Sequence, residues 1–382
     1  MHKAYFDNSA TSFPKPQEVY DAMDNVIREY GVNADRGGYS LARKTGTLIQ
    51  NARTSMTEIV GIHDSQNVIF TPSATIALNT VLLGLDWENG DTVFITPFEH
   101  NGVLRPLYHL RESFGIRIKE IPVERNNLDF DLDALEEAFI KHNPKLVVVN
   151  HGSNVCGVVA PLTHIAEMAK RYGALVLVDT AQTIGCIDID MVEQQLDFLV
   201  FAGHKNLYGP IGIGGVVINS NIRLRPLFYG GTGNDSESEY MPLEYPSRLE
   251  AGSPNIGAIA GLAAGLEFVK DNAQIREHEQ ALFNLLLDEL NNYPEITVFA
   301  SRNSEIRLPV VSCTVAGYTP QEFATVLDRH FGIAVRAGLH CAPAAHKFLG
   351  TAPLGTVRFS IGAFNDLKDI EAVAQALGQL FY

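Results

Sequence analysis

The segments ALVLVDTAQ (residues 174–182) and DFLVFAGHKN (residues 197–206) show one pattern twice: an unbroken apolar run followed at once by polar side chains. An apolar run of this kind, rich in branched residues, is typical of a strand that is buried on both faces of a sheet. Such strands occur in parallel sheets whose two faces are covered by helices. The two segments therefore predict the centre of an α/β sheet, with Asp179 and Lys205 at its edge.

Further segments on both sides repeat this pattern and alternate with amphipathic segments that favour helices. Alternating strands and helices indicate a mostly parallel sheet with helices on both faces, so we expect a large α/β domain over residues 17–260. The other predicted strands are NVIFT (67–71), TVFIT (92–96), IRIKEIPV (116–123), KLVVVNH (145–151) and GGVVIN (214–219). The predicted helices are ATIALNTVLLGL (74–85), DLDALEEAFIKH (131–142) and LTHIAEMAKRYG (162–173).

The last third of the chain has a different organisation. Residues 254–293 form one long helical pattern with a break, and mixed strands and helices follow, ending in DLKDIEAVAQALGQLFY (366–382). We predict a smaller α+β domain made of residues 261–382 together with residues 1–16.

Composition excludes several classes of function. The 382-residue chain has a formal charge of -15, which would repel a nucleic acid. No apolar run of about 18 residues is present, so no membrane span is expected, and the N-terminus lacks a signal-peptide core. The four cysteines are scattered without a CxxC pair, so neither a disulfide framework nor a metal site is expected. A reducing cytoplasm is the expected location.

Polar residues gather at the ends of the predicted strands, where ligands bind in an open parallel sheet. Each has an ordinary structural alternative: a helix cap for Ser73 or Thr75, a surface loop for His100, turn chemistry for Asn154. Asp179 is harder to explain this way, because a carboxylate that ends an apolar strand costs free energy unless it is partnered. The same reasoning applies to Lys205. The full set is Ser73, Thr75, His100, Asn154, Asp179, Gln182, His204 and Lys205.

These side chains match the needs of pyridoxal 5'-phosphate (PLP). Asp179 can keep the pyridine nitrogen protonated, Lys205 can form a Schiff base, and the helix start near Ser73 can hold a phosphate. No G-x-G-x-x-G spacing follows the first strand, so a nicotinamide site is disfavoured.

The motifs VLVDTAQ, FAGHKNLYGPIGIGG, EAGSPNIGAIAGL, RAGLHCA and VRFSIGAFN resemble those of the cysteine desulfurases and selenocysteine lyases. These are PLP enzymes of fold type I in the class V aminotransferase group. The likeness covers nearly the whole chain in the family's order and spacing. The short R-x-G-x-H-C-A segment resembles the SufS-like branch.

The resemblance implies a role for each matching position. Lys205 would hold PLP and move protons, Asp179 would pair with the ring nitrogen, and Cys341 would be the nucleophile that becomes a persulfide. Gln182, with His204 or Asn154, would bind the ring oxygen, and His100 would stack on the ring and act as an acid–base group. The phosphate would be held by Ala74, Thr75 and His204, together with Gly252 and Ser253 of the partner subunit in a homodimer that shares its active sites. Arg358 would bind the substrate carboxylate, with Asn33 and Arg36 lining the pocket.

Alternatives remain open at this stage. Cys341 taken alone is most simply a small packing residue; as a nucleophile it must ionise, which His340 or the cofactor's surroundings would favour. The chain departs from the family at Ala202, where a hydroxyl is common, and at the extra residue Asn206. The expected function is conversion of L-cysteine, or L-selenocysteine, to L-alanine, with a possible sulfur-acceptor protein. Another class V reaction, such as transamination or a different β-lyase activity, and a weakly active cofactor-binding scaffold are the alternatives.

Overall fold

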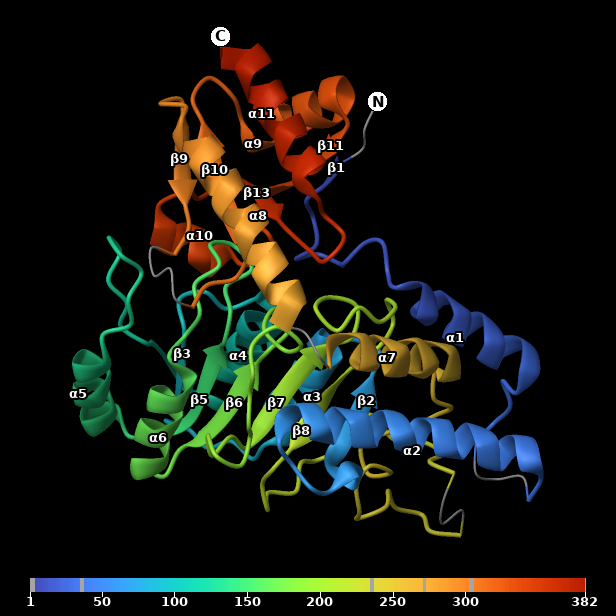
Figure 1. Cartoon of the computed structure of the whole chain (residues 1–382). Coiled ribbons are helices and arrows are strands. Elements are labelled where there is room, and N and C mark those ends of the chain that lie inside the picture. The colour runs from blue at the N-terminus through green and yellow to red at the C-terminus, as the bar shows by residue number, and fades with distance from the viewer. Residues whose placement is uncertain (1–3, 35–37, 234–236, 271–272, 302–305, 382) are drawn as a thin grey trace.

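The computed structural model describes residues 4–34, 38–233, 237–270, 273–301 and 306–381 (Figure 1). A large sheet with its helices occupies one part of the molecule, and a smaller unit containing both chain ends lies above it in this view. The helices are α1 (Gln17–Glu29), α2 (Ser40–Val60), η1 (Ser65–Asn67), α3 (Ala74–Gly84), α4 (Asn101–Phe114), α5 (Leu132–His142), α6 (Leu162–Arg171), α7 (Ile256–Val269), α8 (Ala273–Asn291), α9 (Pro320–Val326), η2 (Leu327–Phe331), α10 (Pro343–Leu349) and α11 (Leu367–Phe381). The strands are β1 (Ala4–Tyr5), β2 (Val68–Thr71), β3 (Thr92–Ile95), β4 (Arg117–Glu120), β5 (Pro144–Asn150), β6 (Leu175–Asp179), β7 (Phe198–Ala202), β8 (Gly214–Ile218), β9 (Ile296–Phe299), β10 (Val310–Val315), β11 (Ile333–Ala334), β12 (Arg336–Gly338) and β13 (Thr356–Ser360).

The large sheet has the order β2-β8-β7-β6-β5-β3-β4. β8 is antiparallel to both of its neighbours, β2 and β7, and every other pair of adjacent strands in this sheet is parallel. All strands of the sheet except β8 therefore run in the same direction. The predicted fold class is confirmed. Each predicted strand and helix named above has a counterpart within two residues at either end, except that β4 ends three residues before the predicted segment 116–123. The apolar segment GGVVIN (214–219) predicted a strand at β8, but it did not reveal that this strand is antiparallel to its neighbours.

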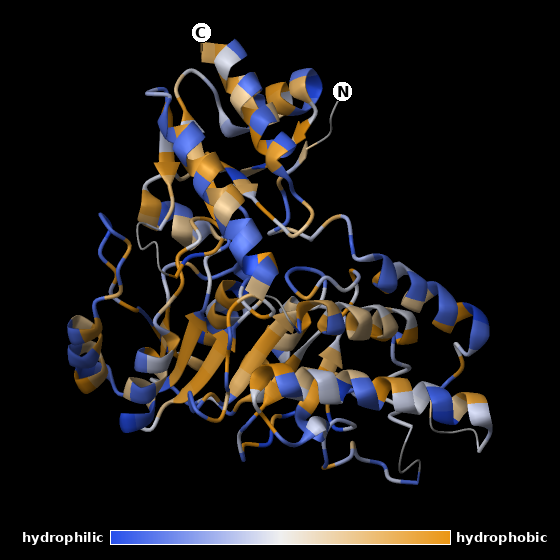
Figure 2. Ribbon diagram, in the orientation of Figure 1, coloured by the Kyte–Doolittle hydropathy of each residue, from blue (hydrophilic) through white to orange (hydrophobic). Residues whose placement is uncertain are grey.

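Each central strand is buried on both faces, which is why its sequence is continuously apolar (Figure 2). Alternate residues of β5, β6 and β7 enter two separate hydrophobic clusters. One cluster joins the sheet to α2, α5, α6 and α7, and the other joins it to α3 and α4. Helices on both faces leave the strand ends as the open edge of the sheet.

The smaller unit contains a four-stranded antiparallel sheet in the order β12-β13-β10-β9 and a short parallel pair, β1-β11. Its own hydrophobic cluster takes residues from β1, α8, α11 and these strands. The predicted division at residue 260 falls inside α7, whose apolar residues pack with the core of the large sheet. We therefore propose that the boundary between the two domains lies at the junction of α7 and α8.

Candidate active site

The carboxyl ends of β2, β3, β5, β6 and β7 meet at one edge of the large sheet, because these strands run in the same direction. Thr71, Ile95, Asn150, Asp179 and Ala202 are the last residues of those strands. The polar residues predicted to converge therefore follow strands that end at the same edge.

Lys205 and Asp179 form the charged centre of this edge. Asp179 is buried, and its Oδ1 accepts a hydrogen bond from the Ala181 N–H at 3.0 Å. Burial raises the pKa of the Asp179 carboxyl, against the opposing effects of that hydrogen bond and of the Lys205 charge. Burial also lowers the pKa of the Lys205 amine to about 8, although Asp179 and the nearby Cys341 thiol favour its charged form. A lysine amine of this pKa is available as a nucleophile near neutral pH.

Two helices begin side by side at the same edge. The Ser73 hydroxyl caps α3 by accepting from the Ile76 N–H at 3.3 Å, and His100 caps α4 by accepting at Nδ1 from the Gly102 N–H at 2.9 Å. A Cβ on Gly102 would lie 3.2 Å from His100 Nδ1 and 3.6 Å from Thr75 Oγ1, so the two helix starts are adjacent. Helix N-termini favour anions, which makes this pair suitable for a phosphate.

His100 is neutral, because burial lowers its pKa to about 4, with further contributions from Lys205 and two arginines. Its Nδ1 accepts a hydrogen bond, so its proton is on Nε2. A neutral ring with a free N–H suits both stacking on an aromatic cofactor and proton donation.

Arg358 comes from β13 of the smaller unit and is 1% exposed. Its guanidinium bonds Asp7 Oδ1 at 2.5 Å and the Asn154 carbonyl at 3.0 Å, while its buried Nε has no partner among the described residues. Asp7 also lies 4.0 Å from Arg336, which pairs with Arg358 in the β12–β13 register. The sequence predicted Arg358 but not Asp7; a carboxylate soon after a short apolar strand was the available signal.

Cys341 is exposed and lies in a tight turn between β12 and α10. The Ala342 N–H bonds the Leu339 carbonyl at 2.8 Å, and both central residues have positive φ, 48° at His340 and 57° at Cys341. Such angles suit glycine or asparagine and cost free energy in other residues. The turn is tied to the large domain, since the Asn154 amide donates to the His340 carbonyl at 2.8 Å and the Asn101 N–H to the Cys341 carbonyl at 2.7 Å. The thiol is therefore held in place close to Lys205.

His340 does not supply a positive charge to this thiol. Its ring is buried, with Nε2 3.3 Å from the Arg336 carbonyl and Nδ1 3.2 Å from His346 Nε2. Burial, reinforced by the charge of Arg358, lowers the pKa of His340 to about 2. The ring is therefore a neutral support beneath the turn.

The N-terminal strap, residues 7–15, crosses the site from one domain to the other. In the smaller unit Asp7 bonds Arg358, and the Ser9 N–H bonds Ser360 Oγ at 2.9 Å. In the large domain the strap fastens the backbone beside Lys205: the Ser12 hydroxyl donates to the Lys205 carbonyl at 3.0 Å, and the Lys15 amine donates to the His204 carbonyl at 2.8 Å. The strap therefore connects Arg358 to Lys205.

The two departures at Ala202 and Asn206 have different outcomes. Ala202 is buried and brings no hydroxyl to the edge. The Asn206 amide donates to the Gln182 carbonyl at 2.6 Å and to Cys186 Sγ at 3.3 Å, so it braces the segment after β6. Gln182 Nε2 donates to the Ser9 carbonyl at 2.9 Å.

The remaining predicted residues lie as follows. His204 has a buried Nδ1 with no partner among the described residues. Gly252, at φ 96°, and Ser253 are exposed on the loop before α7. Asn33 is exposed, and Arg36 lies outside the described residues.

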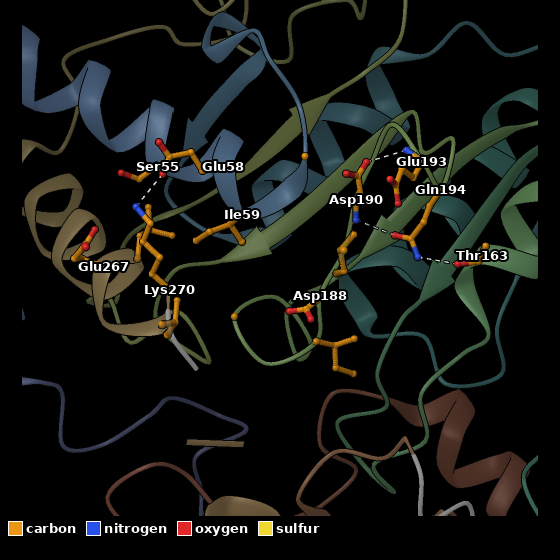
Figure 3. A pocket seen from close by; sticks show the side chains of 16 residues that line it. Ser55, Glu58, Ile59, Thr163, Asp188, Asp190, Glu193, Gln194, Glu267 and Lys270 are labelled. Carbon is orange, nitrogen blue, oxygen red and sulfur yellow. Dashed lines mark hydrogen bonds and ion pairs between the residues drawn. The ribbon is translucent and has the colours of Figure 1, made fainter. Parts of the chain in front are cut away.

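A cavity of about 710 Å³ lies elsewhere, between the end of α2, the segment after β6 and the end of α7 (Figure 3). Its lining combines five acidic residues, among them Glu58, Asp188 and Glu267, with five aliphatic ones. None of the residues predicted from the sequence to bind cofactor or substrate lines it, so it is separate from the edge that carries Lys205.

Comparison with known proteins agrees with this geometry. The model of the class-V aminotransferase family matches residues 4–373. The chain belongs to this family. Within it, a probable cysteine desulfurase from Pyrococcus abyssi is 36% identical over 98% of this chain and 94% of its own length. A solved cysteine desulfurase from Thermococcus onnurineus, in its apo form, has a TM-score of 0.92 at 33% identity, covering 99% of this chain and 94% of that one. A cysteine desulfurase from Escherichia coli has a TM-score of 0.87 at 27% identity, covering 98% and 94%. The resemblance to cysteine desulfurases is confirmed.

Across the described residues, no helix is both long and apolar enough to span a membrane, and no cluster of three or more His, Cys, Asp or Glu side chains could hold a metal ion.

Proposed function

We propose that this chain is a PLP-dependent cysteine desulfurase that converts L-cysteine to L-alanine and keeps the sulfur as a persulfide on Cys341. The observation that carries the proposal is the position of Cys341: an exposed thiol on a turn that Asn154 and Asn101 tie to the edge of the large sheet that carries Lys205. Transamination requires an amine and a cofactor but no thiol, whereas sulfur transfer requires a sulfur nucleophile beside the bound amino acid.

The residues present fit PLP. His204 Nδ1, Asn154 Oδ1 and Arg358 Nε are buried polar atoms without partners among the described residues, and a cofactor with its substrate would supply partners. A Cβ on Gly214 would come within 2.7 Å of the Ala74 nitrogen, so only glycine leaves the start of α3 open. The N–H groups of Ala74 and Thr75 would hold the phosphate, with His204 beside them. Asp179 would hold the proton of the pyridine nitrogen.

When bound, PLP supplies an electron sink for the amino-acid substrate. Lys205 would bind the cofactor and, once displaced by the substrate amine, its free amine would remove the α proton. Its lowered pKa, about 8, favours the unprotonated amine needed for this step. Arg358 would hold the substrate carboxylate through its guanidinium, which Asp7 keeps in place.

Cys341 would then attack the sulfur of the substrate as a thiolate. The new bond joins the two sulfur atoms, and the bond between the substrate Cβ and its sulfur breaks. Its electron pair stays with Cβ, which gains a proton from Lys205 or from the Nε2–H of His100. Lys205 would then return a proton to Cα, which restores the α hydrogen that it removed. The product is L-alanine, and the sulfur remains on Cys341 until a reductant or an acceptor protein removes it.

The partner subunit would complete the site. Gly252 and Ser253 lie on an exposed loop, and the adjoining segment exposes Phe228, Tyr229, Tyr240 and Leu243. Exposed apolar residues gathered on one segment are typical of a protein interface. We infer a homodimer in which Gly252 and Ser253 of the partner subunit approach the phosphate, a state that sedimentation analysis of the purified protein would reveal as twice the chain mass.

Product analysis of Cys341→Ala tests the proposal. The variant should bind PLP, with the yellow colour that borohydride removes, but release no sulfide or alanine from L-cysteine. Cys313→Ala, which alters a buried cysteine in the hydrophobic cluster of the smaller unit, is the matched control and should retain activity. Unimpaired sulfide release by Cys341→Ala would refute the nucleophile, and a keto acid as product of the unmodified enzyme would show transamination instead. L-selenocysteine belongs in the same assay, because selenium leaves more readily and its release would depend less on the thiol.

A further inference from the structure

Glu99 is a buried carboxyl group that the proposed reaction does not use. It stands between β3 and α4, directly before His100, and is 0% exposed. Its Oε1 accepts three hydrogen bonds: from the Thr96 N–H at 3.2 Å, the Thr96 hydroxyl at 2.8 Å and the Asn150 N–H at 2.8 Å. Its Oε2 has no hydrogen-bond partner within the described part of the chain.

This arrangement favours the neutral acid over the carboxylate. In the anion, Oε2 would carry part of a negative charge in a buried place without a donor, which is costly. In the acid, Oε1 is a carbonyl oxygen that keeps all three donors, and Oε2 carries the proton. The side-chain oxygen of Asn150, a buried acceptor in the same region, also lacks a partner and would be served by an added donor.

Asp179 lies on the neighbouring strand. Asn150, whose N–H bonds Glu99, is paired with Asp179 in the β5–β6 register. Burial, together with the Asp179 charge and against the hydrogen bonds from Thr96 and Asn150, raises the pKa of Glu99 to about 8. Asp179 has in addition the Ala181 N–H and the Lys205 amine, both of which favour its ionised form. Two adjacent buried carboxyl groups do not both ionise readily, and the one with cationic and N–H partners keeps the charge.

We propose that Glu99 is a positioning residue, held as the neutral carboxylic acid beside Asp179, so that the single negative charge of the pair stays on Asp179. The inference rests on the proposed function, because that charge is placed where the pyridine nitrogen of PLP would lie. Glu99 touches neither cofactor nor substrate. Its side-chain oxygen accepts hydrogen bonds from the backbone of Thr96 and Asn150, and these bonds hold the ends of β3 and β5. Because Glu99 keeps its proton, Asp179 is the one anion at the ring.

Three variants test this role. Glu99→Gln copies the neutral acid, with an amide oxygen for the three donors and an N–H₂ in place of the O–H. Glu99→Leu removes both the oxygen that accepts the three hydrogen bonds and the O–H group. Glu120→Gln, an exposed carboxyl at the end of the adjacent strand β4, is the matched control. The readouts are the infrared C=O band of a protonated carboxylic acid at pH 7, the dissociation constant of PLP from the apo-protein, and the pH titration of the bound cofactor's visible absorbance.

We expect the unmodified protein and Glu120→Gln to show a component of the infrared band that Glu99→Gln lacks. The buried Glu279, whose pKa burial also raises to about 8, should contribute equally in all three proteins. Glu99→Gln should bind PLP within about threefold of the unmodified protein and leave the absorbance titration unmoved, whereas Glu99→Leu should weaken PLP binding about tenfold or more and shift the titration. An infrared band that is the same in the unmodified protein and in Glu99→Gln, or a loss of PLP binding in Glu99→Gln as large as in Glu99→Leu, would overturn the inference. If Glu99→Leu does not fold, the band and Glu99→Gln decide the matter. Failure of the unmodified protein to bind PLP would refute the proposed function instead, and the infrared band would still report on Glu99 without cofactor.

Discussion

The buried histidine pair under Cys341 makes a quantitative prediction about pH. The Arg336 carbonyl can only accept, so His340 donates to it from Nε2 and accepts at Nδ1 from His346 Nε2, while His346 Nδ1 accepts from the Thr351 hydroxyl at 2.8 Å. The bond from His346 to His340 requires a neutral His340, and acceptance from the Thr351 hydroxyl requires a neutral His346. Burial lowers the pKa of His340 to about 2 and that of His346 to about 4. When the turn opens, both rings return to the ordinary value of about 6.5.

These pKa values determine the direction in which the stability of the turn changes with pH. The closed turn has depressed pKa values, so its stability is complete above about pH 6.5 and is lost as the pH falls and the open form takes up protons. From pH 7 to pH 5 each histidine costs about 2 kcal/mol, and the pair roughly 4 kcal/mol, which is close to a thousandfold in the opening equilibrium.

Hydrogen exchange of peptides covering residues 336–351, corrected for the intrinsic rate, measures this equilibrium. His346→Gln keeps an N–H₂ donor for His340 Nδ1 and cannot be protonated in this range. Between pH 7 and pH 5, the protection factor against exchange should decrease in both proteins. We expect the factor by which it decreases to be about 30-fold smaller in His346→Gln than in the unmodified protein. His278→Gln, which alters an exposed histidine on α8 that bonds the Asn365 carbonyl, is the control and should behave as the unmodified protein does over this segment. An equal loss of protection in the unmodified protein and His346→Gln would refute the assignment of two neutral rings.

Three further results are expected. The rate at which the apo-protein captures PLP, followed by visible absorbance, should rise with pH and level off above about pH 8, because the Lys205 amine loses its proton there; a flat profile from pH 7 to pH 9 would contradict this. Asp7→Ala should raise the KM for L-cysteine about tenfold or more while PLP binding changes little, since it leaves the buried Arg358 without its anion; equal losses in PLP and substrate binding would point to general unfolding. Asn206→Ala should weaken PLP binding only about two- to tenfold, measured by titration, because it removes hydrogen bonds that brace the segment of Gln182 without touching the cofactor; loss of binding beyond about a hundredfold would place Asn206 at the cofactor itself.

The sheet could be predicted from the sequence because strands buried on both faces must be apolar throughout, and because Asp179 and Lys205 end such strands abruptly. The direction of β8 could not, since an apolar run such as GGVVIN looks the same in either direction. The predicted domain boundary at residue 260 falls inside α7 for a similar reason. The small apolar residues of α7 are evenly distributed, so its sequence fits a helix in either domain.

At the site, local patterns revealed the residues that follow strands, but not the contacts between distant segments. Asp7 bonds Arg358, which is 351 positions away, and no local feature of the sequence links them. Glu99 was overlooked beside His100, although an acid within the largely apolar stretch before α4 is the same signal that identified Asp179. His340 was expected to favour the thiolate because its sequence position is next to the thiol, whereas its ring is buried in the protein.

The N-terminal strap has a consequence for synthesis of the protein. Asp7 and Phe6 leave the ribosome first, whereas Arg358 and Phe359, which they contact, come at the other end of the chain. At about 5–20 residues per second, the strap waits roughly 20–70 s for these partners. The large sheet, its loops and the Lys205 edge can fold during that interval, without the strap in place. We therefore expect the part of the site that would bind the cofactor to form in the nascent chain before the part that would bind the amino-acid substrate.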